Sequence, residues 1–451
     1  MSGHADLRSR LAEVDASIAE LHLRLKPLQD ARKQLQSQLD GIVYPVVNLP
    51  PEITSNIFLR CLLPSPELSS PVKTFPSTST APLLFSNLEE LPMEMDEDEL
   101  EKRIADWFGR AGTCPLSLSV RGSMGMGTFG SDAISAIIRH HAPQLQSICL
   151  QLDPAHFEAI AAVIGPFPIL ETLAVALPFQ AGEDEDSLAW KIFSNAPRLS
   201  QLSFSENAIP SMFRPSNDTL VKVTCEVCPA DDFLSIMRNA SVLREFECSI
   251  EPDDLHPYSD SDIISHEHLH TLHLLPYCFY RSLRLLRLPA LQNLRISEDI
   301  HLDETRDFRA FLARSSASLR SFSASCVITT LTVDWFATSM PGLTEIELNV
   351  QDHDILYNFF KRLYRTENPG FLPHLQSLIF RDWAFSMTAS MFRALSSRTI
   401  ADDQTSILSS FRQIWPKGDY MILEDATAAS FRGLVERGMK IHVGPAHRSR
   451  I

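Results

Sequence analysis

The sequence predicts an α/β solenoid in which short parallel strands and helices alternate and stack into a curved array. Two observations predict this fold class. A six-residue motif with apolar first, fourth and sixth positions recurs ten times, with starts 21 to 32 residues apart. Segments whose apolar residues have helical spacing lie between many of the motifs. Self-similarity at such a period is typical of repeat architectures.

The spacing within the motif explains why each copy forms a strand. Side chains two residues apart on a strand point to the same side, so the fourth and sixth positions enter the core together. The first position closes the turn below them. One unit cannot bury its apolar face alone, so the units stack. The motifs begin at Leu145, Leu170, Leu199, Leu220, Leu243, Leu269, Leu291, Leu319, Leu343 and Leu375.

Helical segments and a terminal cap complete this repeat domain, which we expect to span residues 93–445. A further strand is expected at 114–120, where apolar and polar residues alternate before the first motif. Residues 425–443 are expected to form a helix and then a strand that cap the array. The helices between the motifs are expected at 131–141, 154–164, 231–239, 306–315, 352–364 and 387–396.

The N-terminal 43 residues predict a coiled-coil-like helix. Apolar residues from Leu7 to Leu28 keep alternating four- and three-residue steps, as a coiled-coil seam requires. Pro27 lies inside the pattern and predicts a kink there. Residues 5–40 either form a homodimer or pack as a helix or hairpin on their own chain, and the sequence leaves both open.

Residues 44–64 predict a short helix that must dock on another surface. Pro50 and Pro51 open it, since proline suits the first helical turn, and Glu52 complements the helix dipole. Apolar residues then follow at three- and four-residue steps and form one stripe. The helix is too short to be stable alone. A linker rich in Ser and Pro follows at residues 65–92.

These features together resemble a group of fungal F-box proteins with irregular leucine-rich repeats. The motif L-x-x-L-x-L resembles the leucine-rich repeat, and residues 49–62 resemble the first half of an F-box. The second half, with its Arg-Trp pair and Pro-x-Leu-Trp ending, has no counterpart here. The residues that carry the F-box resemblance are Leu49, Pro50, Ile53, Ile57, Phe58 and Leu62.

The resemblance implies a substrate-recognition adaptor of a cullin–RING ubiquitin ligase that is itself no enzyme. The six residues would bind a Skp-type adaptor and through it a cullin, and the concave strand face would bind a target protein. The alternative is a leucine-rich-repeat scaffold without a ligase role, which the missing second half of the F-box favours.

Composition restricts the partners and the compartment. A formal net charge of −16 argues against nucleic acid, whose phosphates require clustered Lys and Arg. No apolar run is long enough for a membrane span or a secretion signal. The eight cysteines are scattered, which favours reduced thiols and a cytoplasmic or nuclear location.

Three motifs that suggest chemistry have simpler explanations. Residues 125–130 match a dinucleotide-binding pattern, but the loop is long and a leucine motif follows. We therefore interpret these residues as a flexible glycine-rich loop. His266 to His270 match H-E-x-x-H, but they lead into an expected strand, where the histidines do not converge as on a helix. Cys225 and Cys228 lack a second pair, and Cys225 is an expected core position. We therefore expect no catalytic residues, no cofactor and no metal.

Overall fold

The computed structural model divides the chain into two compact units, Met1–Thr80 and Ala81–Ile451. In the first unit it describes residues 26–27 and 32. In the second it describes residues 83–87, 114–121, 131–161, 166–178, 193–213, 218–251, 263–275, 280–297, 306–324, 339–350, 352–381, 387–399, 407–415 and 425–445. Apart from residues 26–27 and 32, which are helical and exposed, the seam of residues 5–40 lies outside the described residues. The F-box-like segment 44–64 with its six residues and the glycine motif 125–130 also lie outside them.

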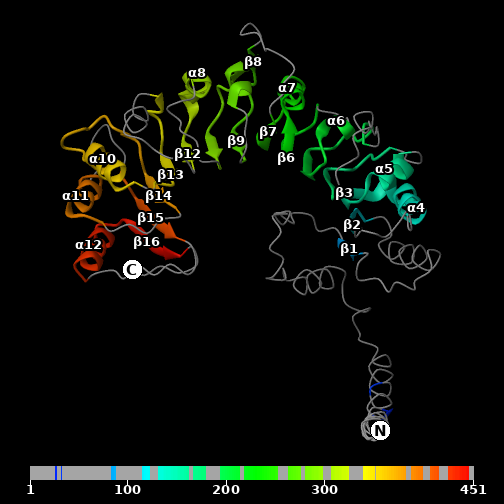
Figure 1. Ribbon diagram of the computed structural model, residues 1–451, viewed down its shortest axis with the longest axis horizontal. Coiled ribbons are helices and arrows are strands. Elements are labelled where there is room, and N and C mark those ends of the chain that lie inside the picture. Colours follow the sequence, from blue (N-terminus) through cyan, green and yellow to red (C-terminus); the bar gives the residue numbers. More distant parts are fainter. Residues whose placement is uncertain are drawn as a thin grey trace, which may run out of the picture. The chain divides into compact units, whose positions relative to one another are not determined.

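The second unit contains one 14-stranded sheet in which all neighbouring strands are parallel. Its order follows the sequence (Figure 1). The strands are β1 (Leu83–Asn87), β2 (Leu116–Arg121), β3 (Leu145–Gln151), β4 (Thr172–Leu177), β5 (Gln201–Glu206), β6 (Lys222–Pro229), β7 (Glu245–Glu251), β9 (Thr271–Leu274), β11 (Asn293–Ile296), β12 (Ser321–Ala324), β13 (Glu345–Leu348), β14 (Ser377–Phe380), β15 (Ser410–Trp415) and β16 (Lys440–Pro445). A two-stranded parallel sheet pairs β8 (Ile264–Ser265) with β10 (Leu286–Arg287).

The helices of this unit lie on one side of the sheet, and the strands line its inner, concave side (Figure 1). The positions expected from the sequence are confirmed closely: the helices at 131–141 and 306–315 have those bounds, and the others agree to within a few residues. The helices are α4 (Ser131–His141), α5 (Pro154–Ala161), α6 (Pro210–Phe213), α7 (Ala230–Asn239), α8 (Arg306–Ser315), α10 (His353–Leu363), α11 (Ala389–Ser397) and α12 (Asp425–Glu436).

Each of the ten motifs places its fourth and sixth positions on a strand, and all three apolar positions of every motif are buried. In register, Phe246 of β7 pairs with Leu272 of β9, and Leu272 pairs with Leu294 of β11. Equivalent motif positions therefore lie side by side across the sheet. The prediction of a solenoid-like α/β fold is confirmed.

A repeated hydrogen-bond pattern holds successive units in register. The carbonyl at motif position two accepts the N–H groups at positions two and three of the next unit. Gln292 O, for example, accepts from Arg320 N at 2.8 Å and from Ser321 N at 2.9 Å. Because one carbonyl binds two donors, a shift of one residue would break both bonds, and such a shift would also turn the core side chains outward.

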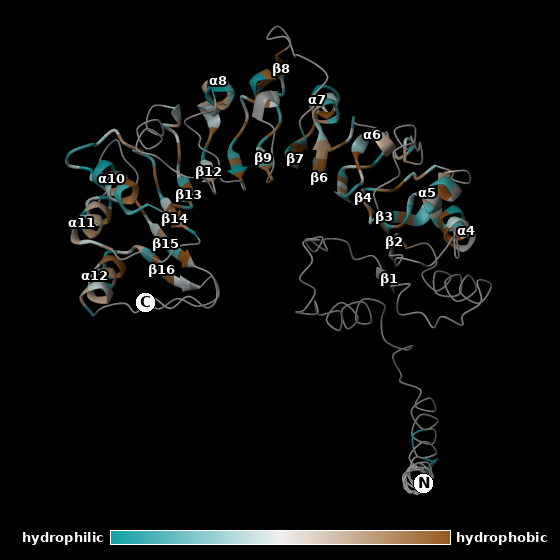
Figure 2. Ribbon diagram, viewed as in Figure 1, coloured by the Kyte–Doolittle hydropathy of each residue, from teal (hydrophilic) through white to brown (hydrophobic). Residues whose placement is uncertain are grey.

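One continuous hydrophobic core runs between the sheet and the helices from Leu116 to Val443. The apolar colouring in Figure 2 concentrates on the strands and on the helix sides that meet them. Aromatic pairs bridge neighbouring units. Phe380 of β14 lies 6.2 Å from Phe411 of β15, and Phe411 lies 6.0 Å from Phe431 of α12, between ring centroids.

Two strands of the 14-stranded sheet differ from the sequence-based expectation. Residues 83–87 were assigned to the linker 65–92, but they form β1 and pair with β2. Its apolar run, Leu83 to Phe85, is only three residues long and too short to identify a strand without its partner. β15 was not expected, because its sixth motif position is Gln413 rather than an apolar residue. Gln413 is nevertheless fully buried, and Gln376 O accepts from Ser409 N and Ser410 N in the pattern of the other units.

Candidate functional site

The candidate site within the described residues is the sheet face opposite the helices, which we call the open face. It is formed by motif positions three and five, whose side chains alternate with the buried positions. We call position five across β2 to β16 the central row. In the order of the strands it contains Ser119, Cys149, Ala174, Ser203, Thr224, Glu247, His273, Arg295, Ser323, Glu347, Ile379, Arg412 and His442.

Position three forms a parallel row, which we call the flanking row. It contains Ser117, Ser147, Thr172, Gln201, Lys222, Glu245, Thr271, Asn293, Ser321, Glu345, Ser377, Ser410 and Lys440. Both rows change in character along the sheet. Up to β5 they carry no charged residue, and from β6 to β16 they carry all of their Lys, Arg, Glu and His residues. The face therefore has an uncharged half and a charged half.

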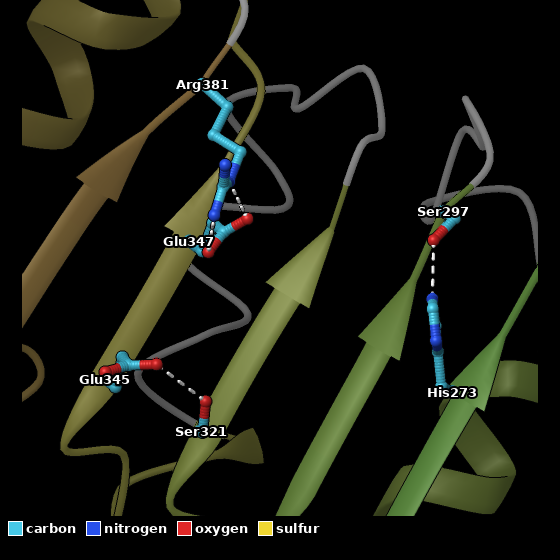
Figure 3. Close-up of polar contacts among 6 residues, drawn as sticks. All are labelled: His273, Ser297, Ser321, Glu345, Glu347 and Arg381. Carbon is cyan, nitrogen blue, oxygen red and sulfur yellow. Dashed lines mark hydrogen bonds and ion pairs between the residues drawn. The ribbon is translucent and has the colours of Figure 1, made fainter. Parts of the chain in front are cut away.

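All four carboxylates of the two rows have partners within the chain. Glu245 forms an ion pair with Lys222 at 3.0 Å, and Glu345 accepts a hydrogen bond from Ser321 Oγ at 3.2 Å. The guanidinium of Arg381, just beyond β14, donates to both carboxylate oxygens of Glu347, with Nη2 at 3.3 Å from Oε2 (Figure 3). Two-pronged contacts of this kind are among the stronger ion pairs.

The fourth carboxylate belongs to a hydrogen-bonded relay across three units. His273 Nδ1 lies 3.2 Å from Glu247 Oε1, and His273 Nε2 lies 2.7 Å from Ser297 Oγ (Figure 3 shows the second contact). The His273 side chain is only 11% exposed. Its two ring nitrogens are both engaged, so the ring orientation is fixed. The three side chains thus form a rigid centre on the charged half.

The relay has the order of groups that activates a serine in hydrolases. Those sites also aim N–H donors at the oxyanion that develops during the reaction. Here the N–H of Ser297 donates instead to Leu274 O at 2.9 Å as part of the ladder between units. The relay therefore matches the hydrolase arrangement in its side chains and differs from it at the backbone of the serine.

The cations of the charged half contrast with its carboxylates. The side chains of Arg295, Arg412 and Lys440 make no hydrogen bond or ion pair with any described residue. Arg295 and Lys440 are exposed, and Arg412 is half-buried. These three side chains are therefore available to an anionic group on the open face.

Two further carboxylates meet beside the open-face rows, Glu206 at the end of β5 and Glu226 within β6. Glu206 accepts a hydrogen bond from Gln151 Nε2 at 3.0 Å, and its own N–H donates to Glu226 Oε2 at 2.8 Å. Glu206 has a φ of 57°, which is unusual for a residue other than glycine. Burial, and to a lesser degree the neighbouring Glu226, raise the pKa of the Glu206 carboxyl, although the bond from Gln151 opposes the shift.

The interpretation of H-E-x-x-H as a turn that leads into a strand is confirmed. His266 Nδ1 accepts from Leu269 N at 3.1 Å, so Nε2 carries the proton and donates to Ala240 O at 2.8 Å. His266 is therefore a buried structural residue that joins its own turn to the end of α7. No group of three metal-binding side chains occurs among the described residues.

Cys225 and Cys228 are both buried, as expected for Cys225 from its motif position. Burial raises the pKa of the Cys225 thiol. The hydrogen bond with Cys225, together with burial, raises the pKa of Cys228 well above its ordinary value. Because the thiolate is the reactive form, these thiols are poor nucleophiles.

Sequence reasoning expected target binding on the concave face but named no residue there. The relay, Arg295 and Arg412 all lie at motif position five or just after a strand. A search of position five across the ten motifs would have found Glu247, His273 and Arg295, but not Ser297, which follows a strand, or Arg412, whose strand the motif did not identify. The six residues expected to bind the Skp-type adaptor are not brought together by any described contact, because they lie outside the part of the chain that the structure describes.

The described part of the chain contains no helix that is both long and apolar enough to cross a membrane. No protein-family model matches this chain, and a search of the curated proteins found no match either.

Proposed function

We propose that this chain is a target-binding adaptor whose open face holds a partner protein. The observation that carries the proposal is the open face itself, a regular array of mostly polar and charged side chains supported by 13 successive strands from β2 to β16. Extended concave surfaces of this kind are the binding surfaces of stacked-repeat proteins. The leucine-rich repeat is the repeat class that the motif resembles.

In the fuller form of the proposal, the chain recruits its target to a cullin–RING ubiquitin ligase. The F-box-like helix would place Pro50, Ile57 and Phe58 on a Skp-type adaptor, with Leu49, Ile53 and Leu62 in the same contact. The recruited ligase and its conjugating enzyme would carry out the chemistry. The support for this step is the resemblance of residues 49–62 together with the apolar stripe, which requires a docking surface.

A second candidate is a scaffold that binds proteins through the open face without a ligase. One observation favours it: the F-box resemblance ends where the Ser- and Pro-rich segment begins, so half of the motif has no counterpart. The two candidates share the open face and differ only in whether residues 44–64 bind the adaptor.

Co-purification with a Skp-type adaptor separates the candidates. The full chain is expressed with the adaptor, purified, and the ratio of the two proteins is measured by quantitative mass spectrometry. A ratio near one that is lost in Ile57→Asp supports the ligase adaptor. Ile263→Asp is the matched control, because Ile263 is 49% exposed and a charge there leaves the core intact. If no adaptor co-purifies with the unaltered chain, the ligase role is refuted and the scaffold remains.

A further inference from the structure

We propose that the charged half of the open face binds an acidic, extended segment of the partner protein, with Arg295 and Arg412 as its two anchoring cations. The proposal rests on the proposed function in one respect, since the segment belongs to the protein held by the open face. It adds the chemistry of that partner and the spacing of its acidic residues.

The first argument is the unequal use of charges on this face. Each of the four carboxylates in the two rows is engaged by a side chain of this protein, whereas three of the four Lys and Arg side chains have no such partner among the described residues. A basic partner would have to break existing pairs, as between Glu347 and Arg381, before it gained new ones. An acidic partner finds Arg295 and Arg412 already uncompensated.

The second argument is the local balance of charge. The two rows contain four Lys or Arg residues and four Glu residues, whereas the whole chain has 40 basic and 56 acidic residues. The open face is therefore far less negative than the chain as a whole. Electrostatic complementarity governs orientation and the suppression of wrong partners more than affinity. A negative segment is thus directed to this face rather than to the acidic remainder of the chain.

The third argument is geometric. Arg295 on β11 and Arg412 on β15 lie in the same row and are separated by four strand spacings, or roughly 19 Å at about 4.8 Å each. An extended peptide rises about 3.3 Å per residue, so the two anchors match acidic residues about six positions apart. The guanidinium group suits this role, because it binds a carboxylate through two parallel hydrogen bonds.

The surface between the two anchors also limits the segment. It consists of Ser323, the Glu347 carboxylate that Arg381 neutralises, and Ile379, which is 5% exposed. No uncompensated charge lies on these three described side chains. The middle of the segment is therefore expected to be uncharged and small, with the acidic residues at its two ends.

The probe is a fluorescein-labelled twelve-residue peptide with two Glu pairs six residues apart and Ser, Ala and Gly elsewhere. Binding to the full chain is followed by fluorescence anisotropy at about 0.05 and 0.15 M salt. A second peptide has the same composition but places the Glu pairs next to each other. An uncharged peptide and a single-stranded RNA of equal charge complete the set.

We expect the spaced peptide to bind more tightly than the adjacent-pair peptide and the RNA. Exposed ion pairs contribute little individually, so Arg295→Ala or Arg412→Ala should weaken binding about threefold. The double charge reversal Arg295→Glu/Arg412→Glu should weaken it at least tenfold. Arg432→Glu, at an exposed position of α12, is the control. It lies off the open face and should leave the affinity unchanged, although it alters the net charge by two, half as much as the double reversal.

Several outcomes would overturn the proposal. They are absence of binding to the spaced peptide, equal affinity for both peptides, equal loss in Arg432→Glu, or tighter binding of the RNA. Circular dichroism of the double variant shows whether it remains folded. Adaptor co-purification depends on residues 44–64 and not on these arginines. If the chain binds its adaptor but not the peptide, only the present proposal is refuted. If it binds the peptide but no adaptor, only the ligase role is refuted.

Discussion

Arg398, which caps the C-terminal end of α11, is a buried cation whose removal should loosen one end of the solenoid. It is 1% exposed, and it donates to Leu363 O at 2.9 Å, to Phe371 O at 2.7 Å and to Leu372 O at 3.4 Å. Burial, and then the neighbouring Arg365, lower the pKa of Arg398 to about 10, so it stays charged at neutral pH. One side chain thus ties α11 to the end of α10 and to the segment before β14.

The substitution Arg398→Met keeps most of the volume and removes all three donors. A hydrogen bond to a charged group contributes about 1.5–3 kcal/mol, and the two shorter bonds dominate here. The substitution also relieves the cost of burying the guanidinium, which offsets part of the loss. We expect a net loss of about 3 kcal/mol in the free energy of unfolding of this end, a large fraction of the 5–15 kcal/mol typical of a folded domain.

Hydrogen exchange measured by mass spectrometry tests this locally, because each unit of a stacked array contacts only its neighbours. Peptides from 363–381 and 407–415 should lose protection in Arg398→Met, while peptides from 145–177 should keep it. Arg393→Met, at an exposed position of the same helix, is the control. A decrease below about 1 kcal/mol in the free energy of opening of peptides from 363–381, or an equal decrease in the control, would refute the reasoning.

Three further substitutions give shorter tests. Because burial raises the pKa of Glu206, its ionised form disfavours the fold, and the native protein loses stability as pH rises through that pKa. Glu206→Gln, which retains an acceptor for Gln151, should therefore gain stability relative to the unaltered chain in urea titrations as pH rises above the ordinary pKa of a Glu side chain. Gly438 follows α12 at a φ of 92°, so Gly438→Ala should lower the free energy of unfolding by about 1–2 kcal/mol, and an unchanged urea midpoint would contradict this. His266→Ala leaves Leu269 N without its acceptor and removes one of the two donors to Ala240 O, which still accepts from Leu243 N, so it should cost about 1–3 kcal/mol. Added zinc should leave the thermal midpoint of the unaltered protein in place.

The repeat was predictable because its core positions are spaced regularly along the chain. Leu272 and Leu274, for example, identify β9 without knowledge of any neighbour, and helices such as α8 were predicted with correct bounds. β15 was missed because Gln413 occupies a buried position that the motif reserves for apolar residues. β1 was missed because its only described strand partner is β2, which lies about 30 residues later in the chain.

The open face could not be read from the sequence in the same way. Glu247, His273 and Ser297 are about 25 residues apart in sequence, and only the register of β7, β9 and β11 brings them into contact. The availability of Arg295 likewise depends on which of its neighbours already have partners. Alternation identifies which residues face outward, but the pairing of their charges is a property of the assembled sheet.

The most direct test of the central claim uses one preparation and two sets of variants. The full chain, Ile57→Asp and Arg295→Glu/Arg412→Glu are each expressed with the Skp-type adaptor, and bound adaptor and bound spaced peptide are both quantified. We predict that Ile57→Asp loses the adaptor and keeps the peptide, while the arginine variant loses the peptide and keeps the adaptor. Loss of both ligands in either variant, with folding intact by circular dichroism, would contradict a chain with separate adaptor-binding and target-binding surfaces.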